Sequence, residues 1–298
     1  MKVNQKLAIA AAICAGTLAI GPSAHAQGGD KGSQLAARVT ALEAKLAALE
    51  AKLQYVTVSG SDMYITGANL NLRSGSGYTG GVNGKGNLVI GYNEGAAGAT
   101  RTGSHNLILG GYNTYASYSG IINGDYNEAR GPYAALLSSN NIVATIDSQY
   151  AGSMSSDNCM MTSAFDSMLG AINCDTTASY GTQIGGSSNT INGSYSVLMS
   201  GQSNVIEAGS LNSSILGGNS NHMWGSLSTI LAGHFNEMYG TRSFIGAGYK
   251  NKVMPAVSSG AVVNGDQVIM QNNYSTIGSG IGVTSSANNQ FKTGGLTG

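Results

Sequence analysis

The chain has 298 residues and a formal net charge of zero, and only 9 % of its residues are charged, where globular proteins usually have about 25 %. A neutral chain without a basic stripe argues against binding to nucleic acid, and we expect no such partner. Low charge suits a stacked repeat, because identical charges about 4.8 Å apart would repel one another along its whole length.

The first 26 residues are typical of an export signal. Lys2 and Lys6 form a basic region before the apolar run from Leu7 to Ile20, and Ala24-His25-Ala26 fits the small-x-small rule for cleavage between Ala26 and Gln27. The apolar run is too short to span a bilayer permanently. We therefore expect an exported protein, extracellular, at the cell surface or in the periplasm, with no transmembrane anchor of its own.

After a glycine-rich linker at 27–34, residues 35–54 predict a coiled-coil stalk. Apolar residues follow one another at spacings of four and three, which is the heptad pattern of an oligomer core. These residues are Leu35, Val39, Leu42, Leu46, Leu49 and Leu53. The alternative is a single amphipathic helix packed on its own domain, although such a helix usually has a wider apolar stripe. The pattern does not decide between two and three strands.

Residues 55–86 change to alternating polarity, as in Tyr55-Val-Thr-Val and Met63-Tyr-Ile-Thr, which predicts a β segment between stalk and repeat. Residues 87–271 form the repeat. An asparagine returns about every fifteen residues, usually three residues after a glycine, and a Gly-Ser or Gly-Thr pair follows. The asparagines are Asn113, Asn127, Asn141, Asn158, Asn173, Asn189, Asn204, Asn221, Asn236 and Asn251.

Each repeat thus predicts two short strands and two turns, with glycine and asparagine supplying the tight turns as a ladder of turn residues. A period this short is one coil of a parallel β-roll, or β-solenoid, so the fold class is mainly β. An antiparallel β-sandwich is the alternative, but its strands would not keep one spacing through ten copies. Residues 272–298 are rich in Gly, Ser and Asn and predict a cap and a poorly ordered tail.

The two strands of a coil differ in their apolar pattern. The strand before the glycine has two adjacent apolar residues, such as Ile215-Leu216, and neighbouring strand residues point to opposite faces. The strand after the asparagine has one inward apolar residue, the series being Val143, Met160, Ile191, Ile206, Met223, Met238 and Val253. One chain forms only one core, so the second apolar face predicts an oligomer, and the protein's first partner is itself.

Cys159 and Cys174 are fifteen residues apart, and each directly follows a repeat asparagine. The same phase in consecutive coils places their Cα atoms about 4.8 Å apart, within reach of a disulfide. Export allows the bond, but a disulfide prefers its Cβ atoms closer than parallel strands hold them. A disulfide and two stacked free thiols both remain open.

No residue pattern predicts catalysis, a metal or a cofactor, and we expect a protein that is not an enzyme. Paired carboxylates on one face are needed for acid–base hydrolysis, whereas the acidic residues of the repeat fall at different phases. His105, His222 and His234 also differ in phase. Gly75-x-Gly77-x-x-Gly80 matches a dinucleotide motif by letter but leads into no helix.

The repeat stretch SVLMSGQSNVIEAGSLNSSILGGNSN, beside a coiled coil, resembles the heads of YadA-like trimeric autotransporter adhesins. The resemblance covers roughly residues 87–270. It implies a homotrimer of left-handed parallel β-rolls, with the doubly apolar strand facing the threefold axis. Coils here are about one residue longer, the stalk precedes the head, and the C-terminal membrane anchor of that family has no counterpart, so its mode of attachment does not carry over.

These features together predict an exported fibrous protein with a structural or adhesin-like role. Its partners would be a surface glycan, matrix or cell-surface protein. Two alternatives remain, a carbohydrate-active β-helical enzyme and a self-polymerising fibre subunit.

Overall fold

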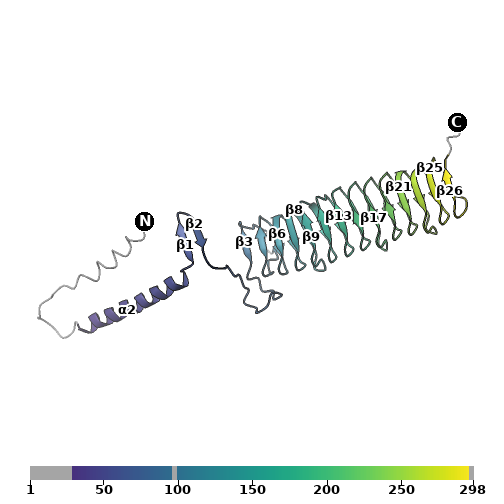
Figure 1. Cartoon of the computed structure of the whole chain (residues 1–298). Helices are drawn as coiled ribbons and strands as arrows, with labels where there is room; N and C mark the ends of the chain where they lie inside the picture. The colour runs from purple at the N-terminus through teal and green to yellow at the C-terminus, as the bar shows by residue number, and fades with distance from the viewer. Residues whose placement is uncertain (1–28, 96–98, 295–298) are drawn as a thin grey trace. The chain divides into compact units, whose positions relative to one another are not determined.

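A computed structural model of the chain describes residues 29–95 and 99–294. The expected export signal and its cleavage site, Ala26–Gln27, lie outside the described residues. The chain divides into two compact units, residues 1–71 and 72–298. Figure 1 shows the described parts of both units.

The described part of the first unit, residues 29–71, contains one helix and one hairpin. Helix α2 spans Gly29–Lys52, and strands β1 (Val56–Ser59) and β2 (Asp62–Ile65) pair antiparallel around a turn with Gly60 at φ 63°. Glycine reaches this left-handed conformation without the steric penalty of a Cβ atom. Near residue 55, the apolar pattern of the sequence changes from heptad spacing to alternation. The structure changes from helix to strand at the same place.

The second unit is a parallel β-solenoid of about 14 turns (Figure 1). The first strands of successive coils are β3 (Leu88–Ile90), β4 (Leu107–Leu109), β6 (Ile121–Asp125), β8 (Ala135–Ala144), β9 (Gly152–Met154), β11 (Ser167–Leu169), β13 (Thr182–Ile184), β15 (Val197–Leu198), β17 (Ser214–Ile215), β19 (Thr229–Ile230), β21 (Phe244–Tyr249), β23 (Ala261–Asp266), β25 (Thr276–Ile281) and β26 (Phe291–Thr293). Each pairs in parallel with the equivalent strand of the next coil, as in Ile215 beside Ile230.

A second series of strands forms the opposite side of the coils. It comprises β5 (Thr114–Tyr115), β7 (Glu128–Ala129), the end of β8, β10 (Asp157–Met161), β12 (Asp175–Thr176), β14 (Thr190–Ile191), β16 (Val205–Ile206), β18 (His222–Met223), β20 (Glu237–Met238), β22 (Lys252–Val253) and β24 (Ile269–Met270). One residue of each short strand points inward and its neighbour outward, so two aligned columns of side chains meet in the core, for example Ile215 and Met223.

The solenoid continues beyond its expected C-terminal boundary at residue 271. Strand β25 pairs with β23 along Ala261–Asp266, and β26 pairs with β25. Glycine, serine and asparagine are abundant here, but they occupy turns and ladder positions as in the preceding coils. Composition alone therefore placed the start of the cap too early.

The asparagine register is wrong in three coils. Strand pairing aligns Asn127 with Ile142 and then with Cys159 and Cys174, so Asn141, Asn158 and Asn173 lie one residue earlier in the coil than predicted. These three side chains are exposed. The inward strand residues are correspondingly Ala144 and Met161, whereas the predicted Val143 and Met160 point outward. A slip of one residue exchanges the two faces of a strand.

Candidate functional site

Seven of the repeat asparagines form a ladder inside the solenoid, not a series of left-handed turn residues. Asn113, Asn127, Asn189, Asn204, Asn221, Asn236 and Asn251 are each at most 1 % exposed. The Asn221 Oδ1 accepts the backbone N–H of Asn236 at 3.0 Å and its side-chain Nδ2 donor at 3.0 Å. The residue before each of them takes the positive φ, as does Phe235 at 58°. Each amide therefore satisfies turn groups that would otherwise be buried without partners.

The three displaced asparagines form a second, exposed ladder. Asn141, Asn158 and Asn173 have φ values of 50–52°, a conformation that asparagine tolerates better than most residues. The Nδ2 of Asn141 donates to Asn158 Oδ1 at 2.7 Å, and the Nδ2 of Asn158 donates to Asn173 Oδ1 at 2.6 Å. The predicted role in a left-handed turn holds for these three alone.

The displacement brings the cysteines into the core. Cys159 and Cys174 occupy the buried column in consecutive coils, and they form a disulfide with a Cα–Cα distance of 4.6 Å. Of the two states left open by the sequence, the structure contains the disulfide. It replaces the hydrogen bonds that asparagine makes between coils elsewhere in the column.

The core beside the disulfide is unusually polar. The buried apolar residues form two clusters, one ending at Cys174 and the other beginning at Ile191. Thr176 and Gln183 are fully buried between them, and the Thr176 hydroxyl and both amide atoms of Gln183 have no hydrogen-bond partner. Unpaired buried polar atoms cost free energy, so this layer contributes less stability than an all-apolar layer would.

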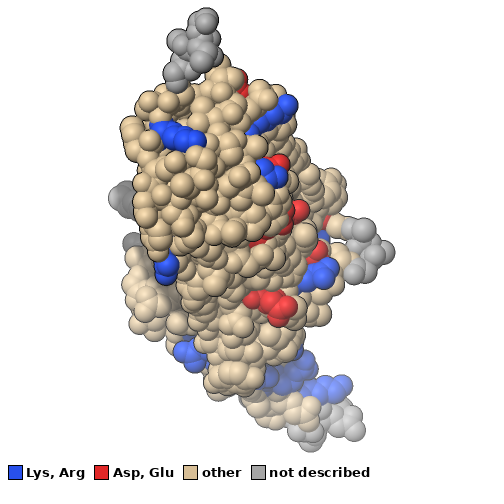
Figure 2. All heavy atoms as spheres, turned by 90° about the vertical axis from the view of Figure 1, so that its right-hand side faces the viewer, with Lys and Arg blue, Asp and Glu red and all other residues tan. Residues whose placement is uncertain are grey.

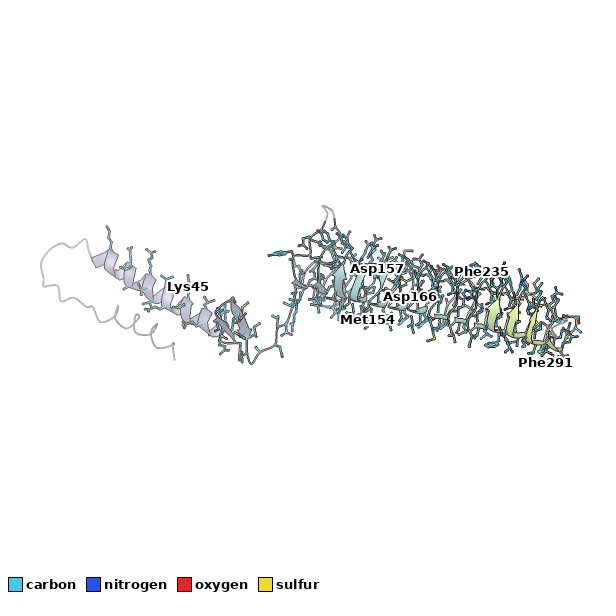
Figure 3. All side chains as sticks on the ribbon, turned by 90° about the horizontal axis from the view of Figure 1, so that it is seen from above. Lys45, Met154, Asp157, Asp166, Phe235 and Phe291 are labelled. Atoms are coloured by element: carbon cyan, nitrogen blue, oxygen red, sulfur yellow. A yellow bond between two sulfur atoms is a disulfide. The ribbon has the colours of Figure 1, made fainter. Side chains whose placement is uncertain are left out.

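Asp166 adds a buried carboxyl group to the same region (Figure 3). Its oxygens accept the backbone N–H groups of Gly181 at 3.1 Å and Ser163 at 3.2 Å. Burial raises the pKa of the Asp166 carboxyl from 3.8 to about 7, although both hydrogen bonds oppose the shift. A single carboxyl without a second acid beside it does not form the pair needed for hydrolysis.

The outer face of the first strands has an aliphatic stripe. Seven consecutive coils place one large aliphatic side chain at the same outward position: Leu137, Met154, Leu169, Ile184, Met199, Leu216 and Leu231. Met154, Leu169, Ile184 and Met199 are 36–48 % exposed. The stripe lies opposite the buried residue of each strand, as the doubly apolar pattern predicts.

An aromatic stack borders this outer face. Tyr133, Tyr150, Phe165, Tyr180 and Tyr195 lie in consecutive coils with ring centroids 4.7–5.1 Å apart and planes within 12° of parallel. All five have positive φ values of 57–63°, where bulky residues are rare and strained. The stacking between rings offsets part of that strain.

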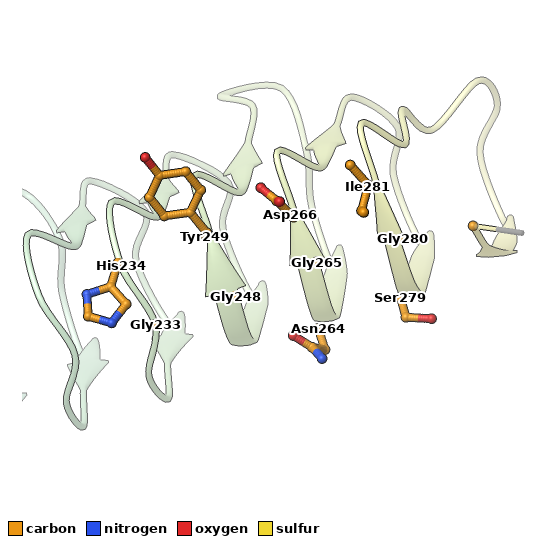
Figure 4. A pocket seen from close by; sticks show the side chains of 11 residues that line it. Gly233, His234, Gly248, Tyr249, Asn264, Gly265, Asp266, Ser279, Gly280 and Ile281 are labelled. Carbon is orange, nitrogen blue, oxygen red and sulfur yellow. The ribbon is translucent and has the colours of Figure 1, made fainter. Parts of the chain in front are cut away.

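A groove runs along the C-terminal coils (Figure 4). It has a volume of about 860 Å³, and its glycine floor consists of Gly233, Gly248, Gly265 and Gly280. His234, Tyr249 and Asp266 line one wall, and Asn264 and Ser279 also line the groove. Sequence reasoning missed this site because its residues follow one another only when coils are aligned.

The histidines do not converge. His105 contacts the segment before the first coil, accepting the Ser74 N–H at its Nε2 at 3.1 Å. His222 lies 3.9 Å from Glu207 and edge-on to Trp224, and His234 lines the groove. Among the residues that the structure describes, no three His, Cys, Asp or Glu side chains are placed to hold a metal ion. Charged side chains are sparse on the face seen in Figure 2.

The heptad residues of α2, and Leu53 directly after it, are solvent-exposed in the single chain. Leu35, Val39, Leu42, Leu46, Leu49 and Leu53 are 45–62 % exposed. In the described portion, no helix has the length and hydrophobicity that crossing a membrane requires.

Comparison with known proteins finds no matching family model, no similar curated protein and no similar solved structure. The likeness to YadA-like heads stays a prediction from the repeat pattern.

Proposed function

We propose that this protein is an exported, non-enzymatic fibrous homotrimer that serves in attachment or extracellular assembly. The observation that carries the proposal is the aliphatic stripe, which extends without interruption through seven coils. Soluble monomers rarely expose apolar patches of such length, and exposed patches generally mark interaction sites. A second copy of the same stripe is the simplest apolar partner for it.

The helix supports the same proposal independently. Five exposed heptad residues lie on α2 and a sixth, Leu53, follows it directly, and burying them between helices is the usual role of such a pattern. Two association surfaces in different units favour one parallel assembly, with stalk beside stalk and solenoid beside solenoid. The number of three chains rests on the resemblance to YadA-like heads, in which three β-rolls surround an axis.

The proposed role in attachment rests on the surface left outside the assembly. The second series of strands points outward with mixed polar residues, including Glu237, Lys252 and Thr190. Side chains repeat there at the coil spacing of about 4.8 Å, which suits a rod that displays a regular polar surface. A surface glycan or an extracellular protein is the proposed partner.

Light scattering on the exported protein tests the assembly, and the mass of a trimer is expected. Leu169→Asp with Met199→Asp places charges in the stripe and should dissociate the solenoids or the whole trimer, because buried unpaired charges are costly. The matched control is Met160→Asp with Val205→Asp, which places the same charges on outward positions of the second strands. The control should remain trimeric.

The stalk is tested separately by Leu42→Asp with Leu49→Asp. These substitutions put like charges in the heptad core and should weaken assembly while the β signal in circular dichroism persists. A wild-type protein that is monomeric and stable at high concentration would refute the proposed assembly. An unchanged trimer in a protein that carries the stripe and the stalk substitutions together would show that another surface holds the chains together.

A further inference from the structure

The glycine-floored groove combines an open channel with polar groups that the protein leaves unused. Gly233, Gly248 and Gly280 have φ values of 101°, 116° and 149°, and a Cβ atom on Gly248 would collide with the carbonyl oxygen of Gly265. Glycine is therefore required by the turn, and the channel follows from the missing side chains. It runs along the rod because the turns of successive coils are aligned.

The walls present hydrogen-bonding side chains at the coil spacing. Strand pairing places Tyr249 beside Asp266 and Asn264 beside Ser279, while His234 is bridged to Tyr249 in the neighbouring coil. The His234, Asn264 and Ser279 side chains make no hydrogen bond within the described part of the chain. Asp266 accepts only a 3.3 Å bond from Gln267 next to it, and its carboxylate remains largely available.

An aromatic ring stands beside these groups. Tyr249 is 39 % exposed and lies edge-to-face with Phe235, with ring centroids 5.9 Å apart. The Lys250 ammonium lies 4.9 Å from the Tyr249 ring centroid. The electrostatic potential of the groove has no strong sign, because it has one carboxylate, one imidazole and one nearby ammonium. The groove therefore suits an uncharged ligand.

We infer that this groove binds a neutral, extended, β-linked polysaccharide chain lying parallel to the rod. Hydroxyl groups can both donate to and accept from the free amide, carboxylate, imidazole and hydroxyl groups of the walls. One pyranose unit of an extended β-1,4-linked chain has about the length of one coil. Adjacent units of such a chain face opposite ways, so every second sugar meets an equivalent position two coils further along the groove. Polar groups at regular positions beside an aromatic ring provide the orientation that small-ligand sites use.

An extended polypeptide fits the groove less well. Peptides that lie along a sheet gain affinity from an unpaired strand edge. The backbone of the groove floor has no such edge, because β21, β23 and β25 already pair with one another from Phe244 to Ile281. A peptide would bond only to side chains there, which a polyhydroxylated chain does with more groups per unit length.

The groove also lies where the aliphatic stripe is interrupted. After Leu231, the equivalent outward positions are Gly246, Val263 and Gly278. If chains associate through the unbroken part of the stripe, little apolar surface beside the groove is buried between them. The groove therefore stays accessible to a ligand. The inference deepens the proposed attachment role and rests on it for biological meaning, but binding in the groove does not itself need a trimer.

Calorimetric titration of the full exported protein with cellohexaose, chitohexaose and xylohexaose tests the inference. At least one of these β-linked chains should bind, while α-linked maltohexaose, which is curved, should bind at least tenfold more weakly. Tyr249→Ala with Asp266→Ala should weaken binding by at least about tenfold, because a carboxylate acceptor and an aromatic ring are both lost. Tyr92→Ala with Asp175→Ala, exposed residues outside the groove, should change affinity less than about twofold.

A second variant, Ser279→Trp, fills the groove from its other wall and should abolish binding without removing a charge. Failure of all three β-linked chains to bind the folded protein would overturn the inference, as would equal affinity in the groove variants and the control. Binding of an extended Gly/Ser-rich peptide in place of the sugars, lost in both groove variants, would assign the groove to a polypeptide and also overturn it. Light scattering on the same samples separates the two proposals: a trimer without sugar binding refutes only the groove, and a monomer that binds sugar refutes only the assembly.

Discussion

The middle of the solenoid, from Ala135 to Ile191, and its C-terminal part, from Val197 to Met270, share one strand pairing but differ in how coils are connected. In the C-terminal part, each asparagine amide from Asn221 to Asn251 donates a hydrogen bond to the asparagine of the preceding coil, which forms a continuous series that begins at Asn204. In the middle, Ile142, Cys159 and Cys174 occupy that column, and a disulfide spans one coil step. The comparison indicates that the column must connect coils, whereas the chemistry of the connection can change.

The serine column shows the same contrast. Ser213, Ser228 and Ser243 are buried at equivalent positions of consecutive coils. Their hydroxyl groups bond to the backbone of the next coil: the Ser228 hydroxyl donates to the Gly240 carbonyl at 2.9 Å and accepts the Ser243 N–H at 3.0 Å. Asp166 takes this position in the middle region and receives the Gly181 N–H. The middle region therefore has a covalent link but carries a buried acid and an unpaired amide.

The largest expected difference between the regions is in the asparagines. Asn221→Ala should lower the free energy of unfolding by about 4 kcal/mol, because several buried backbone groups lose their partners at once. Asn158→Ala is the matched change in the exposed ladder, and it should cost about 1–2 kcal/mol, because alanine is strained in the left-handed conformation that Asn158 adopts. Urea unfolding measures both. Equal losses would mean that burial of the ladder does not determine its contribution.

Removal of the disulfide should have the next largest effect. Cys159→Ala with Cys174→Ala should destabilise the protein by about 3 kcal/mol, since the bond closes a loop of about 15 residues. Hydrogen exchange should quicken in β10–β12 and change little in β18–β20. Wild-type protein unfolded with reductant present provides the control, and it should lose similar stability. Faster exchange throughout the rod would contradict a local role.

The buried acid should make stability depend on pH. The unfolded Asp166 ionises near pH 3.8, whereas the native group keeps its proton until about pH 7, so native stability falls as pH rises between these values. Asp166→Ser matches the serine column and should add about 2 kcal/mol at pH 8, because the cost of a buried carboxylate disappears while some packing is lost.

The gain from Asp166→Ser should be smallest below pH 4 and grow up to about pH 7. Thermal melts across this range measure it. Asp175→Ser, at an exposed position of β12, should show no such growth. A gain that is the same at pH 4 and pH 8 would show that packing, and not ionisation, explains the effect.

The smallest expected effect concerns Gln183, which lies between Met168 and Leu198 in the apolar column. Gln183→Leu removes two unpaired buried polar atoms and should raise the free energy of unfolding by about 1 kcal/mol. Gln202→Leu, an exposed position, is the control and should give no gain. Destabilisation by Gln183→Leu would indicate that a polar group in this layer has a partner in the assembled protein.

The sequence predicts most of the second unit because its determinants are local and repeated. The doubly apolar strand, the turn glycines and the period of about fifteen residues specify one coil, and stacking of equal coils follows from burying their common core. The glycines that precede a repeat asparagine by three residues all have positive φ: Gly110, Gly124, Gly170, Gly186, Gly201, Gly218, Gly233 and Gly248. The same periodicity places Cys159 and Cys174 at equivalent positions of consecutive coils.

The register of the middle coils was predictable only in part. The residues that follow Asn141, Asn158 and Asn173 are Ile142, Cys159 and Cys174, whereas Thr, Val, His, Glu or Lys follow most other ladder asparagines. An apolar residue directly after the asparagine is only a partial signal that the inward position has moved by one, because Val205 also follows an asparagine, Asn204, that keeps the regular buried register. Asn93, which accepts the Asn113 N–H at 2.8 Å, was also missed because twenty residues separate the two.

The sequence by itself determined the strand type, the coil period, the glycine turns and the apolar positions of the helix, since each depends on neighbours close in the chain. Tertiary structure alone decided which asparagines are buried, that the cysteines form a disulfide, and that Asp166 and Gln183 lie in the core. It also decided that His234, Tyr249 and Asp266 share one groove. The physical reason is that inward or outward orientation depends on pairing with the next coil, where a slip of one residue leaves the period unchanged but exchanges the faces.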